Sequence, residues 1–344
     1  MADGRLWSGQ ARRREDVCCA AGWHRSRERG ADPRRLSATV AADAQSEGRA
    51  ADMQSSTLRK GVMSSSLPAC GADPVEAPSD LGAWTTWFAG AEIPVLRDTA
   101  DSLEAFRANE DKVDANSMGE MISGDPLMTL KVLAYESGHR GRRVVTSAET
   151  VISALVMMGI SPFFRAFGPQ TTIDDVLADR PDALTGLRRV MLRAHRGANF
   201  ALAFAIHRTD PDAAVIHAAA LLHEFAEMLL WCHAPTLALR LQAMQAADPE
   251  MRSSAAQLSV LHIELAELQR ALAEEWRLPE LLLNSTSGLQ SAGQTSARIV
   301  ALAARLARHT ARDWDNPAIP DDVSEIATLL NLSSEATLHL LTEI

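Results

Sequence analysis

The sequence predicts an all-helical protein, and composition and periodicity both support this prediction. Aromatic residues make up only 5% of the chain, and alanine and leucine dominate its second half. Long β-branched runs that alternate with polar residues, which are typical of strands, are absent, and glycine-rich hairpin signals are few. Apolar residues instead recur at three- and four-residue spacing. We therefore expect a helical bundle of two lobes that follows a leader.

The leader is expected over residues 1–78. It is rich in Arg, Ala and Ser and has almost no periodic apolar face. Such a segment buries too little apolar surface to offset the entropy lost on ordering, so we predict that it is disordered. It also lacks the apolar core of a secretory signal. An alternative is that translation starts at Met53 or Met63 and that the earlier residues do not belong to the protein.

The first helical lobe is expected over residues 80–185. Asp125 and Pro126 form a clear start signal, because Asp caps free N–H groups and Pro fits the first position of a helix. After a basic loop, Thr146 or Ser147 is placed to cap the following helix. Glycine and proline then mark an irregular connection to the second lobe.

The second lobe is expected over residues 186–310, with a helical extension over 311–344. Apolar periodicity predicts one long helix at 187–207, a second at 212–233 and a third at 253–276. Asp-Pro pairs separate the second and third helices from their neighbours. The order of these segments places the 212–233 helix at the centre of the lobe.

The 212–233 helix is apolar nearly all round, yet it carries three polar residues. His223, Glu224 and Glu227 would lie inside the protein, where an unpaired charge is costly, so they need partners. The structural interpretation is a hydrogen bond from His223 to Glu227, one helical turn later. The functional interpretation is that His223 binds a ligand or metal.

Two groups of arginines are candidate sites for an anion. One is a basic loop, and the other is one side of the 187–207 helix. Their members are Arg140, Arg142 and Arg143 in the loop and Arg188, Arg189, Arg193 and Arg196 on the helix. We expect both groups to face solvent, and binding of a phosphate or another anion is the alternative.

Composition argues against several functional classes. The formal net charge of −10 does not suit a general nucleic-acid binder, which needs a basic surface. No run of about 18 uninterrupted apolar residues is present, so we expect no membrane span. The four cysteines have no metal-binding spacing, and Cys232 is expected to be a reduced core thiol. We expect a cytoplasmic protein.

Several segments in a fixed order carry a resemblance to a known family. They are GDPLMTLKVLAYES, ETVISALVMMGI, a helix with a central histidine, ALLHEFAEMLL, and LHIELAELQRALAEEWRLPELL. In this order the chain resembles the HDOD domain, an output-domain relative of the HD metal-dependent phosphohydrolases. The match covers about residues 80–340, and residues 79–340 are expected to form one HDOD domain. The resemblance implies a two-lobed helical fold and a role in bacterial signal transduction.

The resemblance also implies where a metal site would lie. HD enzymes use a metal to activate water against a phosphate ester. By this resemblance His195 corresponds to the first histidine ligand, His223 to the histidine of the His-Asp pair, and His262 to a later histidine, while Glu224 stands in place of the aspartate. A following His-His pair is missing, and alanine stands where a late aspartate is expected. We therefore predict His195, His223, Glu224 and His262 as the remnant of an incomplete metal site.

These observations lead to one preferred function and two alternatives. The preferred function is a non-catalytic signalling or scaffold module that binds a signalling protein, with no cofactor, nucleic acid or membrane. The first alternative is a divergent phosphohydrolase that retains Fe, Mn or Mg and acts on a nucleotide or phosphodiester. The second is binding of a nucleotide without hydrolysis. Neither the partner nor the oligomeric state follows from the sequence.

Overall fold

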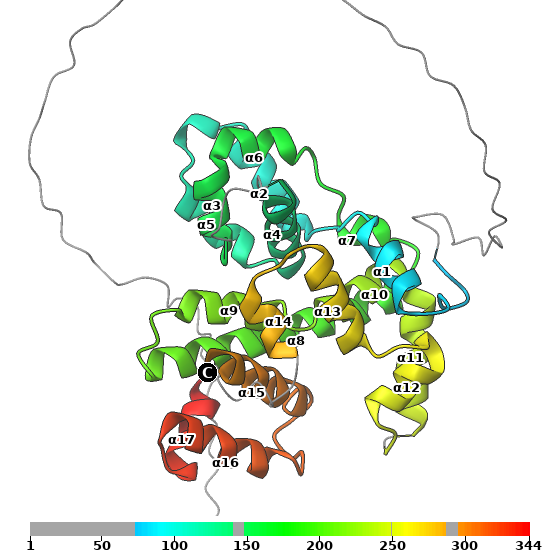
Figure 1. Cartoon of the computed structure of the whole chain (residues 1–344), viewed down its shortest axis with the longest axis vertical. Helices are drawn as coiled ribbons and strands as arrows, with labels where there is room; N and C mark the ends of the chain where they lie inside the picture. The colour runs from blue at the N-terminus through cyan, green and yellow to red at the C-terminus, as the bar shows by residue number, and fades with distance from the viewer. Residues whose placement is uncertain (1–72, 140–147, 249, 287–294) are drawn as a thin grey trace, which may run out of the picture. The chain divides into compact units, whose positions relative to one another are not determined.

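A computed structural model describes residues 73–139, 148–248, 250–286 and 295–344 (Figure 1). Every regular element in these ranges is a helix, and the only strand-like pairing among them is a single parallel bridge between Val95 and Thr172. The prediction of an all-helical fold is therefore confirmed. Most of the predicted leader and the basic loop with its three arginines lie outside the described residues.

The described chain begins inside the predicted leader, at Asp73. Its carboxylate forms an ion pair of 2.9 Å with Arg180 and accepts a hydrogen bond from the hydroxyl of Thr236 at 2.5 Å. Pro74 and Pro78 are buried. The last residues of the predicted leader are therefore attached to the helical domain.

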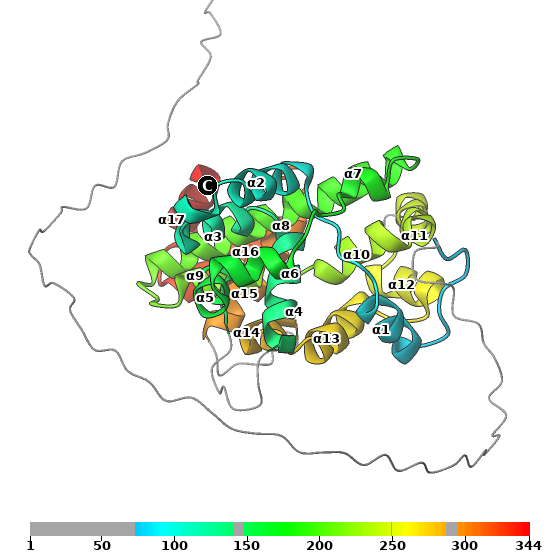
Figure 2. The same ribbon diagram turned by 90° about the horizontal axis from the view of Figure 1, so that it is seen from above.

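The first half of the domain contains seven α-helices and one short 3₁₀ helix within its described residues. Their bounds are α1 (Leu81–Ala89), α2 (Arg97–Arg107), η1 (Glu110–Lys112), α3 (Ala115–Ser123), α4 (Pro126–His139), α5 (Val151–Met158), α6 (Ile160–Ala166) and α7 (Ile173–Val176). Helices α2 to α6 pack on one another, whereas α1 packs on α13 (Leu265–Glu275) of the second half. In both views α1 lies beside α13 and away from α3 and α5 (Figures 1 and 2).

The start of α4 agrees with the sequence signal. One oxygen of Asp125 accepts hydrogen bonds from the backbone N–H groups of Leu127 and Met128, at 2.9 and 3.1 Å. Its other oxygen accepts from the backbone N–H of Leu96 at 2.8 Å. Asp125 is fully buried. The predicted cap therefore also fixes the start of α4 against the start of α2.

The cap of α5 differs from the prediction. The cap is Thr150: its hydroxyl accepts a hydrogen bond from the backbone N–H of Ser153, and the hydroxyl of Ser153 accepts one from the backbone N–H of Thr150, which completes a capping box. Thr146 and Ser147 lie outside the described residues. Thr150 directly precedes the first helical residue, so its oxygen reaches an N–H group of the first turn. The helix ends at Gly159, whose φ of 85° suits glycine.

The second half supplies the remaining described helices. Their bounds are α8 (Pro181–His207), α9 (Ala213–Leu221), α10 (Phe225–His233), α11 (Pro235–Ala247), α12 (Ser253–Leu261), α13 (Leu265–Glu275), α14 (Glu280–Thr286), α15 (Thr295–His309), α16 (Ile319–Leu330) and α17 (Ser334–Glu343). The 27-residue helix α8 packs along both α9 and α15 (Figures 1 and 2). This packing forms the core under the candidate site.

The single helix predicted at 212–233 is in fact two helices, separated by a turn. The side-chain amide of Gln269 on α13 occupies the break: its nitrogen donates to the carbonyl of His223, and its oxygen accepts from the N–H of Ala226 at 3.4 Å. These bonds replace backbone hydrogen bonds that the turn removes. By length and composition alone Ala213–His233 would pass as a membrane span, as core helices also do, and 56% of its most apolar window is buried in the protein.

The helix predicted at 253–276 is also divided. It breaks at His262, whose φ of 63° is left-handed. The carbonyl of Leu261 at the end of α12 accepts a hydrogen bond from Trp84, and the N–H of Leu265 at the start of α13 donates to the side chain of Gln257. Side chains that the local pattern does not reveal therefore satisfy both helix ends.

Candidate functional site

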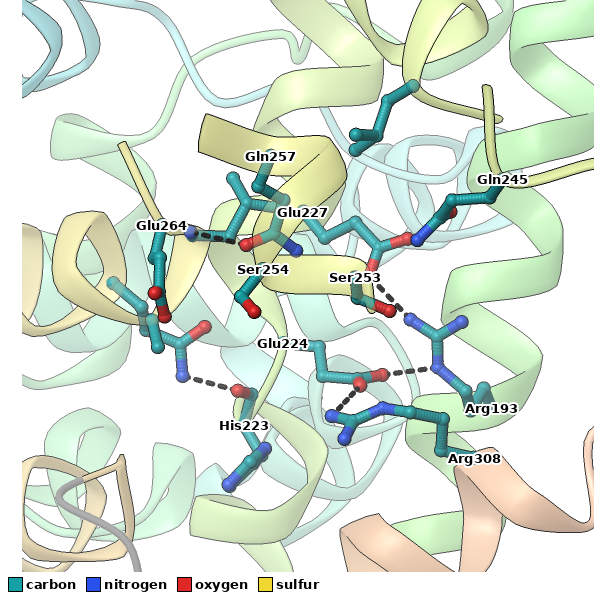
Figure 3. Close-up of a pocket in the computed structure, with 14 residues that line it drawn as sticks. Arg193, His223, Glu224, Glu227, Gln245, Ser253, Ser254, Gln257, Glu264 and Arg308 are labelled. Atoms are coloured by element: carbon teal, nitrogen blue, oxygen red, sulfur yellow. Dashed lines mark hydrogen bonds and ion pairs between the residues drawn. The ribbon is translucent and has the colours of Figure 1, made fainter. Parts of the chain in front are cut away.

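A polar pocket of about 440 Å³ lies in the second half of the domain. Side chains from α8, α10, α11, α12, α13 and α15 line it, together with the turn between α9 and α10 (Figure 3). Arg193, Arg308, Glu224 and Glu227 form a connected charged cluster on one side of the pocket, whereas Glu264 lies beside Gln257 and Ser254. The pocket volume falls in the range of small-molecule sites.

The charged wall is centred on Arg193 of α8. Its Nε donates to one oxygen of Glu224 at 2.6 Å, and its Nη2 donates to Glu227, also at 2.6 Å. The side chain of Arg193 is 17% exposed, and those of Glu224 and Glu227 are 10% and 29% exposed. One guanidinium therefore bridges two carboxylates in a mostly buried position (Figure 3).

A second arginine completes this cluster. Arg308 of α15 donates from Nη2 to the other oxygen of Glu224 at 2.9 Å, and its side chain is about half exposed. Both oxygens of Glu224 therefore accept hydrogen bonds from arginines. The cluster joins α8, the start of α10 and the end of α15.

The protonation of the two glutamates follows from burial and from these arginines. Burial acts to raise the pKa of Glu224, but the charges of Arg193 and Arg308 outweigh it and hold that pKa below its usual value. Burial raises the pKa of Glu227, and the charge of Arg193 only partly offsets it. Glu224 is therefore the firmly ionised member of the pair.

The expected hydrogen bond between His223 and Glu227 is not formed, because Glu227 faces Arg193. The imidazole of His223 points away from the two carboxylates (Figure 3). Its Nδ1 is buried and has no hydrogen-bond partner among the described residues. Burial lowers the pKa of His223, so the ring is neutral at pH 7.

The other two predicted histidines lie outside the pocket. His195 is half-buried on α8, where burial lowers its pKa and the charge of Asp125 partly opposes this effect. His262 is exposed at the turn between α12 and α13. Of the four predicted metal-site residues, the structure brings only His223 and Glu224 to the same pocket. Nowhere in the described ranges do three or more His, Cys, Asp or Glu side chains form a group suited to a metal ion.

Sequence reasoning missed the role of Arg193. Arg188, Arg189 and Arg196 on the same helix are exposed as predicted, but the side chain of Arg193 is mostly buried against carboxylates. The signal was present: Glu224 and Glu227 on an apolar segment require opposite charges. In the sequence His223 is the nearest possible partner of Glu227. The packing of α8 on α10 shows that the partner is Arg193.

The arrangement defines a class of protein: an all-helical domain whose second half has an arginine–carboxylate cluster as its polar centre. The model of the HDOD domain matches residues 93–291, and the chain belongs to the HDOD family. The family expected from the sequence is thereby confirmed.

Solved structures show the same fold. The MmoQ response regulator from Methylococcus capsulatus is 19% identical, with a TM-score of 0.53, and the match covers 73% of this chain and 98% of that one. A virulence factor from Campylobacter jejuni is 17% identical, with a TM-score of 0.53 and coverage of 74% and 90%. At these identities the likeness concerns the fold. No curated protein matches this chain.

Proposed function

We propose that this protein is a non-catalytic signal-transduction module of HDOD type that acts by binding a signalling protein. The observation that carries the proposal is that Glu224, which stands in place of the expected metal-binding aspartate, has both oxygens engaged by arginines. A hydrolytic metal needs several donor atoms and open positions for water and substrate.

The metal that the family resemblance implies does not fit these residues. Glu227 also faces Arg193, His223 points away from the carboxylates, and His262 is exposed elsewhere. A divalent cation placed between the glutamates would be repelled by two guanidinium groups.

Composition supports the proposed cellular location and class of partner. The net charge of −10 supports a cytoplasmic protein that binds neither nucleic acid nor a membrane as its main partner. We propose that the unit relays a signal through contact with a separate protein.

A metal and activity measurement tests the non-catalytic role. Full-length protein is analysed for bound Fe, Mn and Zn, and hydrolysis of nucleotides and phosphodiesters is assayed with added Mn²⁺. We expect neither stoichiometric metal nor turnover above background. His223→Ala removes a pocket residue, and His262→Ala is the matched control at an exposed histidine. Turnover lost in the first variant and kept in the second would establish the alternative, a phosphohydrolase.

A binding experiment tests the protein-contact role. Full-length protein serves as bait, and each enriched candidate is purified and titrated against it by calorimetry. A saturable complex between purified components supports the proposal. Enrichment of chaperones alone, with no saturable complex, would contradict it.

A further inference from the structure

A guanidinium group lies between the two glutamates where the family resemblance implies a metal ion. Glu224 directly precedes α10 and Glu227 lies in its first turn, and both direct a carboxylate toward the same point (Figure 3). Two partly buried carboxylates that share a site repel each other unless a cation lies between them. At this point the structure places the guanidinium of Arg193.

Arginine suits this position because its planar group presents several N–H donors in a fixed geometry. Nε serves one carboxylate and Nη2 the other, each at 2.6 Å. Besides Arg193, Arg308 is the only arginine or lysine among the described residues that line the pocket, and the imidazole of His223 points away from the carboxylates. Arg308 contacts Glu224 and not Glu227. Arg193 is therefore the cation that holds the pair together.

We propose that Arg193 takes the place of a metal ion in this lobe, and that the glutamate pair becomes a divalent-cation site when Arg193 is removed. This inference rests on the proposed non-catalytic function and gives its physical basis. Replacement of the guanidinium by a neutral amide would leave Glu224 and Glu227 without the cation between them, with only Arg308 in contact with Glu224. Carboxylate oxygens are hard donors of the kind that Mn²⁺ and Mg²⁺ prefer.

Thermal unfolding with and without MnCl₂ tests this inference on the full chain. We expect the Tm of the wild-type protein to be insensitive to Mn²⁺. Arg193→Gln should lower the Tm in the absence of metal, and Mn²⁺ should restore several degrees of it in a saturable manner. Arg189→Gln, at an exposed arginine one turn earlier on α8, is the matched control and should show neither effect.

Two further variants assign the response to the glutamate pair. Arg193→Lys keeps the charge, so its Tm should not respond to Mn²⁺. Glu224→Gln combined with Arg193→Gln removes one carboxylate and should abolish the response. If Arg193→Gln fails to fold, refolding with and without Mn²⁺ replaces the melting curves: recovery only with Mn²⁺ supports the inference, and failure under both conditions while Arg193→Lys folds contradicts it.

A different pattern would overturn the inference. It fails if Arg193→Gln is destabilised with no response to Mn²⁺, or if Mn²⁺ stabilises the wild-type protein in a manner that Glu224→Gln removes. Its failure is distinguishable from failure of the proposed function, because turnover by the wild-type protein would refute that function whatever the melting curves of the Arg193 variants show.

Discussion

The indole Nε1 of Trp84 donates a hydrogen bond of 2.9 Å to the backbone carbonyl of Leu261, which lies 177 residues further along the chain. Trp84 is fully buried and stacks on Phe88. The bond joins α1 to the end of α12, at the left-handed turn of His262. It explains why α1 belongs with the second half of the domain and satisfies a carbonyl that the turn leaves without its helical partner.

Replacement of Trp84 by Phe should destabilise the protein by about 1–3 kcal/mol, because the buried carbonyl of Leu261 loses its donor. The free energy of unfolding in urea measures this loss. Trp87→Phe is the matched control, since the indole nitrogen of Trp87 is buried without a hydrogen-bond partner among the described residues. Equal losses in the two variants would show that ring volume, and not the hydrogen bond, is responsible.

Gly186 of α8 is required by close packing. A Cβ atom at this position would lie 2.4 Å from the ring of Trp231. We therefore expect Gly186→Ala to cost about 1–3 kcal/mol through displacement of that ring. Gly138→Ala on α4 is the control, because a Cβ there meets nothing within 4 Å and should stabilise the helix by up to about 1 kcal/mol. Urea unfolding of both variants measures the difference, and similar free energies would refute the packing argument.

The free energy of unfolding should decrease as the pH is lowered, because of His233. Burial lowers the pKa of this histidine from 6.5 to about 4 in the folded state. The unfolded chain binds the proton more tightly, so stability present above pH 6.5 is lost as the pH falls toward 4, by up to about 3 kcal/mol. The measurement is the free energy of unfolding across this range for the wild type and for His233→Gln. The variant should show a shallower slope, and an unchanged slope would exclude His233 as the cause.

Asp125 should tolerate substitution by asparagine poorly. Its two oxygens accept three backbone hydrogen bonds, one of them from Leu96. Asparagine keeps one acceptor oxygen and turns a donor toward the other N–H position, so we expect a loss of about 1–2 kcal/mol. Asp114→Asn is the control, because Asp114 caps α3 in an exposed position. Thermal or urea unfolding compares the two, and equal effects would contradict a special role for burial.

Much of the fold was predictable where the signal is local. Asp125 caps α4, as predicted. Gly159 ends α5, and Asn331 ends α16 with a φ of 56°, which are residue types that tolerate a positive φ. Ser333 also caps α17. Such signals depend on the conformational preferences of one residue and its nearest neighbours, which the sequence states directly.

The candidate site was predictable only in part. The sequence identified Glu224 and Glu227 as buried charges in need of partners, because an apolar helix cannot leave them unpaired. It selected His223 as the partner of Glu227 because that residue is one turn away. The actual partner is Arg193, more than 30 residues earlier, and no spacing rule links it to the glutamates.

By itself the sequence determined the helical class, the family order of its segments, the local helix caps and the presence of a charged centre in an apolar segment. The tertiary structure decided where two predicted helices break, where α1 packs and which cation neutralises the glutamates. The physical reason is common to all three: side chains distant in sequence, Gln269, Trp84 and Arg193, supply the hydrogen bonds and charge that those positions require.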